Sequence, residues 1–283
     1  MKTWFITGAS RGMGATFVQA ALQRGDSVVA AARNPKSITE RFGSPANLLA
    51  VRLDVNAEAE AEAAARQAVE RFGRIDVLVN NAAFGVLGAV EEIPAAEVEA
   101  VYRTNVFGLL SVTRAILPQL RRQRSGHIIN ISSIGGYQSY AAWTVYASTK
   151  FAVEGISEGL AMELKPLGIK VTVVEPGYFR TDFLDGASLT TTQKVIEDYA
   201  GTVGEIRKHA VALNHKQLGN PEALAQGLLK IVDAEDPPLR MPFGSDTVAA
   251  IEAKNAFVAE ELRQWRSLAL STDFPDAGGS RAA

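Results

Sequence analysis

The sequence predicts an α/β fold: a single doubly wound domain in which helices cover both faces of a parallel sheet of six or seven strands. Short β-branched runs alternate with longer segments of helical period from residue 1 to about residue 180, the pattern of successive βαβ units. The short runs are apolar almost throughout, as expected of strands buried on both faces. No long linker divides the 283 residues and no internal repeat is visible, so we expect one domain over 1–283.

Six strands and four crossover helices are predicted in this part of the chain. The strands are Thr3–Thr7, Ser27–Ala32, Leu48–Leu53, Ile75–Asn80, His127–Ser132 and Lys170–Glu175, and Leu239–Pro242 is compatible with an edge strand. The helices are Gly14–Arg24, Glu58–Phe72, Asn105–Arg124 and Tyr146–Leu167. The first helix stops at Gly25 and the second at Gly73, because glycine favours the backbone conformation that ends many helices.

The alternation breaks in the last third of the chain. Residues 183–218 form an insertion rich in Thr, Gly and Gln where a crossover helix is expected, and such insertions often act as substrate lids. A helix resumes after Pro221, and apolar residues recur at helical spacing from about 246 to 269. This last helix is expected to pack on its own domain or on a sister subunit. Residues 271–283 are expected to form a frayed tail.

The composition excludes several classes of function. With 29 basic and 31 acidic side chains, the chain lacks the basic field of a surface that holds nucleic acid or anionic lipid. It contains no Cys and three His, so we expect no disulfide, no thiol nucleophile and no metal site. No apolar window of about 18 residues appears and the first strand begins at once, so we expect no membrane span, no signal peptide and a cytoplasmic location.

A glycine-rich turn follows the first strand and opens the first helix. It reads Thr7-Gly8-Ala9-Ser10-Arg11-Gly12-Met13-Gly14. Glycines at such a turn let the backbone approach a pyrophosphate at the positive end of the helix, as in Rossmann-type dinucleotide sites. The same residues are also compatible with a tight strand–helix connection that binds nothing.

The end of the second strand indicates which dinucleotide fits. A site that prefers NAD carries an acidic residue there for the ribose 2′-OH, whereas this chain reads Ala30-Ala31-Ala32-Arg33. Arg33 and Arg11 suit a 2′-phosphate, which predicts NADP(H); the alternative is two solvated arginines. Asp54, after the third strand, is either an adenine ligand or the N-cap of the next helix.

Three residues form a candidate catalytic group. Ser133 follows a strand end, and Tyr146 and Lys150, four residues apart, lie on one helical face above the strand ends where open α/β sheets bind ligands. A free phenol has a pKa near 10 and is a poor base at neutral pH. One ammonium at about 4 Å favours the phenolate by about 4 kcal/mol at an effective dielectric constant of about 20, before desolvation is subtracted. The Ser133 hydroxyl can orient a carbonyl oxygen. The alternative is an ordinary amphipathic helix with an exposed Lys.

Together these motifs resemble those of the classical short-chain dehydrogenase/reductase family. The similarity covers residues 1 to about 182, and a weaker likeness continues to Gly244. Its motifs are Thr7-Gly8-x3-Gly12-x-Gly14, Asn80-Asn81-Ala82-Ala83, Asn105, Ser133, Tyr146-x3-Lys150 and Pro176-Gly177-x3-Thr181. The family usually has Gly where this chain has Ala83, and the added Cβ is expected to affect cofactor fit slightly without loss of activity.

The resemblance implies a role for each candidate residue. Tyr146 is the expected general acid/base, Ser133 orients the substrate oxygen, Lys150 binds the nicotinamide ribose and lowers the tyrosine pKa, and Asn105 holds a proton-relay water. The residues expected to contact NADP(H) are Gly8, Ser10, Arg11, Gly12, Met13, Gly14, Arg33, Asp54, Val55, Asn81, Ala82, Tyr146, Lys150, Pro176, Gly177, Phe179 and Thr181.

Large side chains near the catalytic group predict a greasy cleft for the substrate. The candidates are Gln138, Tyr140, Trp143, Phe183 and Leu184, although any one of them is equally compatible with a core or interface position. We therefore expect an NADP(H)-dependent oxidoreductase that interconverts a hydrophobic ketone or aldehyde and its alcohol by direct hydride transfer, with Tyr146 as general acid/base.

Two other functions stay open. A non-catalytic NADP(H)-binding sensor or scaffold is expected to have a broken catalytic tetrad, and here all four residues are present. An epimerase or dehydratase on a related scaffold retains its cofactor without net consumption. The resemblance also implies a homodimer or homotetramer, paired through the helices at about 105–124 and 146–166, with the 246–269 helix placed to alter that pairing.

Overall fold

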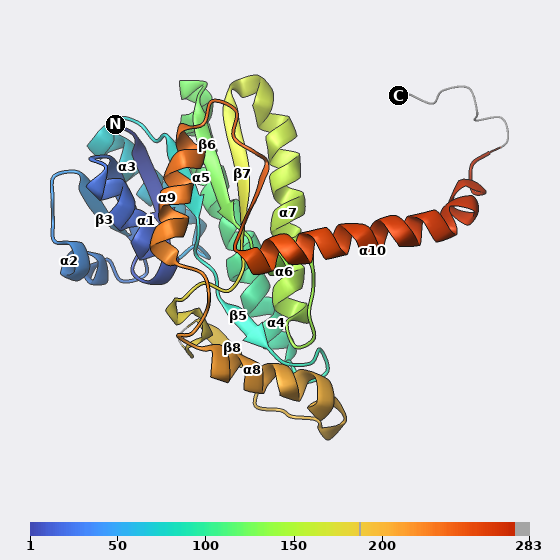
Figure 1. The fold of residues 1–283 in the computed structure, drawn as a ribbon. Coiled ribbons are helices and arrows are strands. Elements are labelled where there is room, and N and C mark those ends of the chain that lie inside the picture. The colour runs from blue at the N-terminus through green and yellow to red at the C-terminus, as the bar shows by residue number, and fades with distance from the viewer. Residues whose placement is uncertain (187, 275–283) are drawn as a thin grey trace.

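The computed structural model describes residues 1–186 and 188–274, and its core is one seven-stranded parallel sheet (Figure 1). The strand order is β3-β2-β1-β4-β6-β7-β9. The strands are β1 (Thr3–Thr7), β2 (Ser27–Ala32), β3 (Leu48–Arg52), β4 (Val77–Asn80), β6 (Gly126–Ile131), β7 (Ile169–Pro176) and β9 (Arg240–Phe243). The predicted parallel sheet is confirmed, including the edge strand, which pairs with β7. Every residue of β1, β2 and β4 is buried, as predicted for strands covered on both faces.

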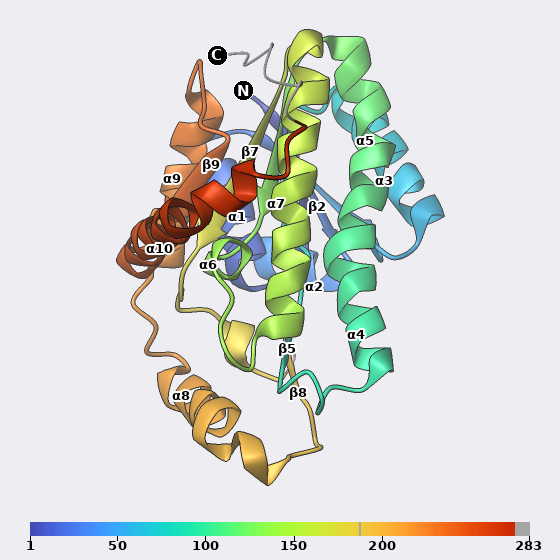
Figure 2. The ribbon, with the colours of Figure 1, turned by 90° about the vertical axis from the view of Figure 1, so that its right-hand side faces the viewer.

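Helices cover both faces of this sheet. They are α1 (Gly12–Gln23), α2 (Lys36–Phe42), α3 (Glu58–Phe72), α4 (Ala95–Tyr102), α5 (Leu109–Gln123), α6 (Ile134–Tyr137), α7 (Thr144–Leu164), α8 (Glu205–Leu213), α9 (Pro221–Asp233) and α10 (Ser245–Leu270). Phe17 of α1 packs with Leu224 and Leu228 of α9 on one face, and Val112 and Ile116 of α5 pack with alanines of α3 on the other. Figure 2 shows α3 and α5 on the opposite side of the sheet from α9. The fold is therefore a doubly wound Rossmann-type α/β fold.

The strand order reverses beside β1, and this reversal fixes where a ligand can enter. From β1 the sheet extends through β2 to β3 on one side and through β4 to β6 and β7 on the other. Ligands of open α/β sheets bind in the crevice beyond the carboxyl ends of the strands at such a point. Thr7 and Asn81 close the base of this crevice, because the backbone N–H of Asn81 donates to Thr7 Oγ1 at 2.9 Å.

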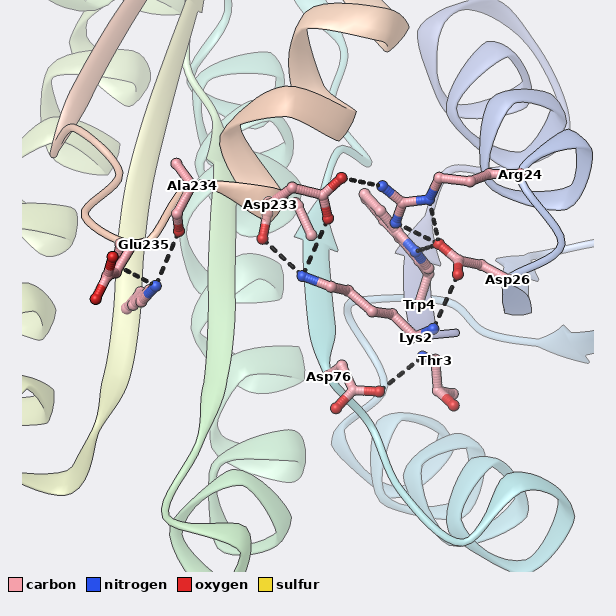
Figure 3. Close-up of polar contacts among 11 residues, drawn as sticks. Lys2, Thr3, Trp4, Arg24, Asp26, Asp76, Asp233, Ala234 and Glu235 are labelled. Carbon is pink, nitrogen blue, oxygen red and sulfur yellow. Dashed lines mark hydrogen bonds and ion pairs between the residues drawn. The ribbon is translucent and has the colours of Figure 1, made fainter.

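A polar network around Asp26 holds together the amino ends of the strands, on the side of the sheet away from the crevice (Figure 3). The Asp26 carboxylate accepts hydrogen bonds from the backbone N–H of Lys2 at 2.9 Å, from Trp4 Nε1 at 2.9 Å and from Arg24 Nε at 2.8 Å. Arg24 also pairs with Asp233 at 2.8 Å, which ties α1 to the end of α9. Burial opposes ionisation of Asp26, but these donors outweigh it and hold the carboxyl pKa below its ordinary value.

The insertion between β7 and α9 contains a helix and a strand that the sequence analysis does not predict, besides three short turns of 3-10 or π-helix. One is α8, and the other is β8 (Leu189–Thr191), which pairs in parallel with β5 (Gly85–Leu87). A buried carboxylate holds this insertion: Glu92 Oε2 pairs with Arg207 Nη2 at 2.6 Å, and Glu92 Oε1 accepts the N–H of Ile196 at 2.9 Å. Both views show the insertion gathered at one end of the molecule (Figures 1 and 2).

The last helix, α10, leaves the rest of the protein. It spans the predicted range, and Figure 1 shows it extending far to one side of the sheet and its covering helices. Every residue from Asn255 to Leu270 is exposed, so the alternative in which this stretch packs on its own domain is wrong. No helix among the described residues is long and apolar enough to cross a membrane. Of the tail expected at 271–283, residues 275–283 lie outside the described part of the chain.

Candidate functional site

A cavity of about 640 Å3 opens at the carboxyl ends of the strands, where the strand order reverses. Its walls come from the turn after β1, the end of β2, the segments after β4 and β6, the start of α7 and the segment after β7. Every predicted cofactor residue except Gly14 lines this cavity. Of the four candidate catalytic residues, Ser133, Tyr146 and Lys150 line it and Asn105 does not.

The glycine-rich turn forms the floor of the cavity, and its glycines are required by geometry. Gly8 and Gly12 have φ of +63° and +52°, in the left-handed region that favours glycine. A Cβ at Gly14 would lie 2.2 Å from the Gly8 carbonyl oxygen, so only glycine lets α1 pack this closely against the turn. Gly14 therefore does not line the cavity but packs against the turn that forms its floor. Gly12 and Met13, in the first turn of α1, line the cavity.

The wall after β2 carries cationic and neutral donors and no carboxylate from residues 31–37. Arg33, Asn34 and Ser37 line this wall, and Arg11 lines the adjacent turn. Both arginines are exposed, whereas Ala32 is 8% exposed. A 2′-phosphate at this wall can be paired by guanidinium and hydroxyl groups.

Asp54 lines the cavity and also shapes the turn that precedes α3. Its Oδ1 accepts the N–H of Asn56 at 3.0 Å, and its own N–H donates to Glu60 Oε2 at 2.7 Å. The N-cap position of α3 is Ala57, so the prediction that Asp54 caps this helix is wrong. The adenine contact stays a prediction.

Ser133, Tyr146 and Lys150 come together from the end of β6 and the first turns of α7. Ser133 is the N-cap of α6, where its Oγ accepts the N–H of Gly135 at 3.0 Å, and its hydroxyl is close enough to the phenol of Tyr146 to lower the phenol pKa. The Nζ of Lys150 lies 5.7 Å from the centroid of the Tyr146 ring. Lys150 is 3% exposed, so the alternative of an ordinary helix with an exposed Lys is wrong.

Burial controls the ionisation of this group. It raises the pKa of the Tyr146 phenol well above its ordinary value, and the Ser133 hydroxyl offsets only part of the rise. Burial also lowers the pKa of Lys150 to about 8, against the opposing field of Glu154. The Nζ of Lys150 donates to the carbonyl oxygen of Ile131 at 2.8 Å. Burial therefore outweighs the lowering of the phenol pKa that the sequence analysis expects from this ammonium.

An acidic pair lies next to Lys150 in the interior. Glu154 of α7 and Glu175 of β7 both approach Arg240 of β9, whose Nε lies 3.2 Å from Glu154 Oε2 and 3.7 Å from Glu175 Oε1. Burial and the neighbouring Glu154 raise the pKa of Glu175 to about 7, while Arg240 opposes the rise. Glu175 therefore changes its protonation near neutral pH, and the field of Glu154 acts on Lys150.

Asn105 lies outside the cavity, in a π-helical turn over Arg103–Gly108. Its Nδ2 donates to the carbonyl of Phe84 at 2.9 Å and to Thr149 Oγ1 at 3.1 Å, and its Oδ1 accepts the N–H of Phe84 at 3.1 Å. These bonds tie the segment after β4 to α7. The water-holding role implied by the family resemblance stays a prediction.

The substrate half of the cavity is apolar. The rings of Trp143 and Phe183 each lie with their centroids 5.6 Å from that of Tyr146. Tyr140 and Leu184 pack in the same cluster, so four of the five predicted substrate residues line the cavity. Gln138 does not line the cavity, and its N–H donates to the carbonyl of Ile134 at 3.0 Å, so its contact with the substrate stays a prediction.

Gln217 is a cavity residue that the sequence analysis does not identify. It is 1% exposed, and neither its amide oxygen nor its amide nitrogen has a hydrogen-bond partner among the described residues. Gly219, two residues later, pairs with Phe179, which places Gln217 beside the segment after β7. The only signal in the sequence is a polar residue in a polar insertion, which does not distinguish a buried position.

Asp182, Asp185 and His215 have ligand atoms within 4.8 Å of one another, and Asp182 also lines the cavity. Asp185 already pairs with His215 at 3.4 Å and accepts a hydrogen bond from Asn214 Nδ2 at 2.6 Å. Asp182 and His215 are exposed, and Asp185 already has two partners in His215 and Asn214. We therefore assign no metal to this group.

Comparisons with known proteins agree with this geometry. The short chain dehydrogenase family model matches residues 2–191. Oxidoreductase BOA17 from Botryotinia fuckeliana is 38% identical over 274 residues, which cover 96% of this chain and 99% of that protein. A 3-ketodihydrosphingosine reductase from Bacteroides thetaiotaomicron is 35% identical over 92% of this chain and 94% of that protein.

Solved structures share the whole architecture. A short-chain dehydrogenase from Streptomyces avermitilis has a TM-score of 0.88 at 36% identity, covering 96% of this chain and 100% of its own. ElxO with NADP bound has a TM-score of 0.73 at 26% identity, covering 88% of this chain and 99% of its own. The chain therefore belongs to the short-chain dehydrogenase family of oxidoreductases.

Proposed function

We propose that this protein is an NADP(H)-dependent oxidoreductase that interconverts a hydrophobic ketone or aldehyde and its alcohol. The observation that carries the proposal is the position of the Tyr146 phenol. It lies with Ser133 in the cavity that begins at the glycine-rich turn, and the rings of Trp143 and Phe183 flank it. A carbonyl oxygen held by Ser133 and Tyr146 has apolar side chains around its carbon substituents.

Tyr146 moves the proton at the substrate oxygen in this proposal. Its raised pKa keeps the phenol protonated at neutral pH, which suits reduction, where the oxygen gains a proton. Oxidation requires the phenolate, which the Lys150 ammonium stabilises. The Ser133 hydroxyl donates to the same oxygen and shares its developing charge. When bound, NADP(H) supplies the two-electron redox change.

The cavity walls fit a dinucleotide with a 2′-phosphate. Gly8 and Gly12 hold the turn open, and Arg11, Arg33 and Ser37 line the wall where the 2′-phosphate is expected. Structural neighbours include proteins with NAD bound and with NADP bound, so the preference for NADP(H) rests on these side chains alone.

The substrate class is inferred from the apolar walls and from the names of relatives. Two similar proteins are named for long apolar substrates: the 3-ketodihydrosphingosine reductase and human retinol dehydrogenase 8, which is 37% identical over 59% of this chain and 56% of that protein. Leu184 and Leu189 extend the cavity wall into the insertion, which fits a long hydrocarbon substituent. We therefore propose a carbonyl carried on an extended apolar skeleton.

The test is a panel of aliphatic, aromatic and steroid-sized ketones, followed by the loss of NADPH absorbance. We expect turnover to increase with the apolar bulk of the ketone. NADPH binding without consumption on any ketone or aldehyde would support the sensor alternative, and substrate conversion without net NADPH consumption would support an epimerase or dehydratase. Either result contradicts the proposal.

A further inference from the structure

The helix α10 is anchored only at its first turns. The Asp246 carboxylate accepts the N–H of Tyr178 at 2.8 Å, and the buried Thr247 donates its hydroxyl to the carbonyl of Phe243 at 3.2 Å. Among the described residues, the contact between α10 and the rest of the protein that lies farthest along the helix is the hydrogen bond from the Tyr137 hydroxyl to Asn255 Oδ1. Residues 256–270 then extend about 22 Å, at about 1.5 Å per residue, beyond the rest of the protein. Figures 1 and 2 agree on this projection, along the page in one and toward the viewer in the other.

One face of α10 carries an apolar stripe with heptad spacing. The stripe consists of Val248, Ile251, Val258, Leu262 and Trp265, with Asn255 completing the alternation of three and four residues. Leu262 and Trp265 are 61% and 63% exposed. A strict three-and-four alternation is the seam of a helix that packs on another helix. A helix that only extends into water gains nothing from such a seam, because exposed apolar surface is unfavourable.

The charges around the stripe favour a partner of the same kind. From Glu252 to Arg266 the helix carries Glu252, Glu260 and Glu261 against Lys254, Arg263 and Arg266, so the two signs cancel. Helices that bind anionic membranes carry a basic polar face instead. A balanced face suits a second helix with the same balance.

An antiparallel pair also matches charge with charge. When Ile251 lies opposite Leu262 of the second copy, Val248 lies opposite Trp265, and Lys254 lies opposite Glu261 on both sides of the two-fold axis. A parallel pair brings both sheet domains to the same end of the two helices, where each helix is already held against its own domain. We propose that α10 is a dimerisation arm that pairs antiparallel with the α10 of a second copy of this chain.

The experiment uses the absence of cysteine from the chain, since any single thiol is then introduced by design. Ala259→Cys places a thiol beside the stripe, and the matched control Ala253→Cys places one on the opposite face of the same helix; both alanines are exposed. With a short bis-maleimide we expect Ala259→Cys to form a covalent dimer and Ala253→Cys to form none. Adding Leu262→Glu to the first variant should also remove the dimer.

A charge exchange tests the orientation of the pair. Lys254→Glu is expected to reduce cross-linking through Ala259→Cys, and adding Glu261→Lys is expected to restore it, since each change reverses one member of the same intermolecular pair. Equal cross-linking in all charge variants would contradict the antiparallel arrangement. Equal cross-linking from the two faces of the helix, or none from either, would overturn the second-copy proposal. So would binding of uncross-linked protein to phosphatidylcholine vesicles that is lost in Trp265→Glu.

Discussion

The Nζ of Lys150 lies 5.7 Å from the ring centroid of Tyr146 and gives its hydrogen bond to the carbonyl oxygen of Ile131, 2.8 Å away. The ammonium therefore acts on the phenol through space. An ammonium favours a phenolate, and here this attraction competes with the burial that raises the phenol pKa. The lysine can have this effect only while it is charged, and burial brings its pKa down to about 8.

The first prediction concerns the proton donor. Tyr146→Phe should lower kcat for ketone reduction by about 10²–10⁴ with little change in the Kd for NADPH, because it removes the hydroxyl and keeps the ring between Trp143 and Phe183. Tyr102→Phe is the matched control, since the Tyr102 hydroxyl binds Ser148 Oγ at 2.8 Å and Tyr102 does not line the cavity. A Tyr146 variant within about tenfold of the parent would remove the tyrosine from the mechanism.

The second prediction is that Lys150 is held at a cost to stability. Its pKa falls from 10.5 to about 8 on burial, so keeping it charged in the folded state costs about 3 kcal/mol. Lys150→Met should abolish turnover. It should also increase the free energy of unfolding by about 1–3 kcal/mol at neutral pH. The increase is expected to be smaller than the full cost of the buried charge because Glu154 loses a cationic neighbour.

The pH dependence of this gain has a definite sign. Below pH 8 the lysine is charged in both the folded and the unfolded state, and the full cost is present. Between about pH 8 and pH 10.5 the folded state releases its proton first, so the parent recovers stability and the gain should shrink. Denaturant unfolding at neutral pH and near pH 10 measures this, with the exposed Lys165→Met as control. A gain that is constant across this range would contradict the assigned cause.

Sequence patterns predict the elements whose burial is local and regular. β1 and β2 match their predicted bounds, because continuous apolar runs leave no other way to bury both faces. The helix α8 was not predicted because it buries little of its own: Ala210 is its one buried residue, and Arg207 holds it to Glu92, 115 residues away in sequence. A contact between residues so far apart in the chain produces no periodic pattern of apolar residues in the sequence.

The candidate site divides in the same way. Ser133, Tyr146 and Lys150 follow from one strand end and one helical turn, so spacing alone brings them together. Gln138 is a candidate because it lies between Ser133 and Tyr146 in the sequence, but it stands at the end of α6 and does not line the cavity. Gln217 enters the cavity only because the insertion returns to pair with Phe179, which no local pattern encodes.

The third prediction concerns the insertion as a substrate lid. Arg207→Met leaves the Glu92 carboxylate, whose side chain is wholly buried, without its cation and should increase limited proteolysis within residues 188–218 by at least about tenfold. Lys208→Met, an exposed neighbour in the same helix, is the control. NADPH with a product alcohol should protect the parent segment, and equal cleavage with and without these ligands would show that it is not a lid.

Acid should release the same contact. Burial opposes ionisation of Glu92, but the N–H groups of Ile196 and Ala89 and the Arg207 guanidinium outweigh it and hold the carboxyl pKa below 4.5. A lowered folded-state pKa gives stabilisation that is present above 4.5 and lost as the pH falls. The protection factors of residues 196–210 against hydrogen exchange, which are corrected for the intrinsic effect of pH on the exchange rate, should therefore fall below about pH 4.5 in the parent, and less so in Glu92→Gln.

The fourth prediction concerns Gln217. Its buried amide lacks partners among the described residues, and a buried polar group without a hydrogen bond is costly, so a ligand of the cavity is expected to supply them. Gln217→Leu should leave the free energy of unfolding unchanged or higher and weaken NADPH binding about fivefold. Gln138→Leu is the matched control because Gln138 lies outside the cavity. Unchanged NADPH affinity with a raised KM for the ketone would assign Gln217 to the substrate instead.

The fifth prediction concerns the choice between NADPH and NADH. The two cofactors differ by a 2′-phosphate, and the wall that is expected to meet it carries Arg33, with Arg11 on the adjacent turn. One charge-assisted hydrogen bond contributes about 1.5–3 kcal/mol, so kcat/KM should favour NADPH by about tenfold or more. Ala32→Asp combined with Arg33→Ala adds repulsion of the phosphate and removes attraction, so the preference should invert.

The two substitutions can be separated, because Arg33→Ala alone removes only attraction and should reduce the preference without inverting it. Both cofactors are compared in all variants at one fixed ionic strength, since salt screens exposed arginine–phosphate pairs. The preference of the parent should also decrease as salt increases, which a preference built on shape alone does not do. A parent that prefers NADH, or a double variant with an unmoved preference, would show that residues other than Ala32 and Arg33 read the ribose 2′ position.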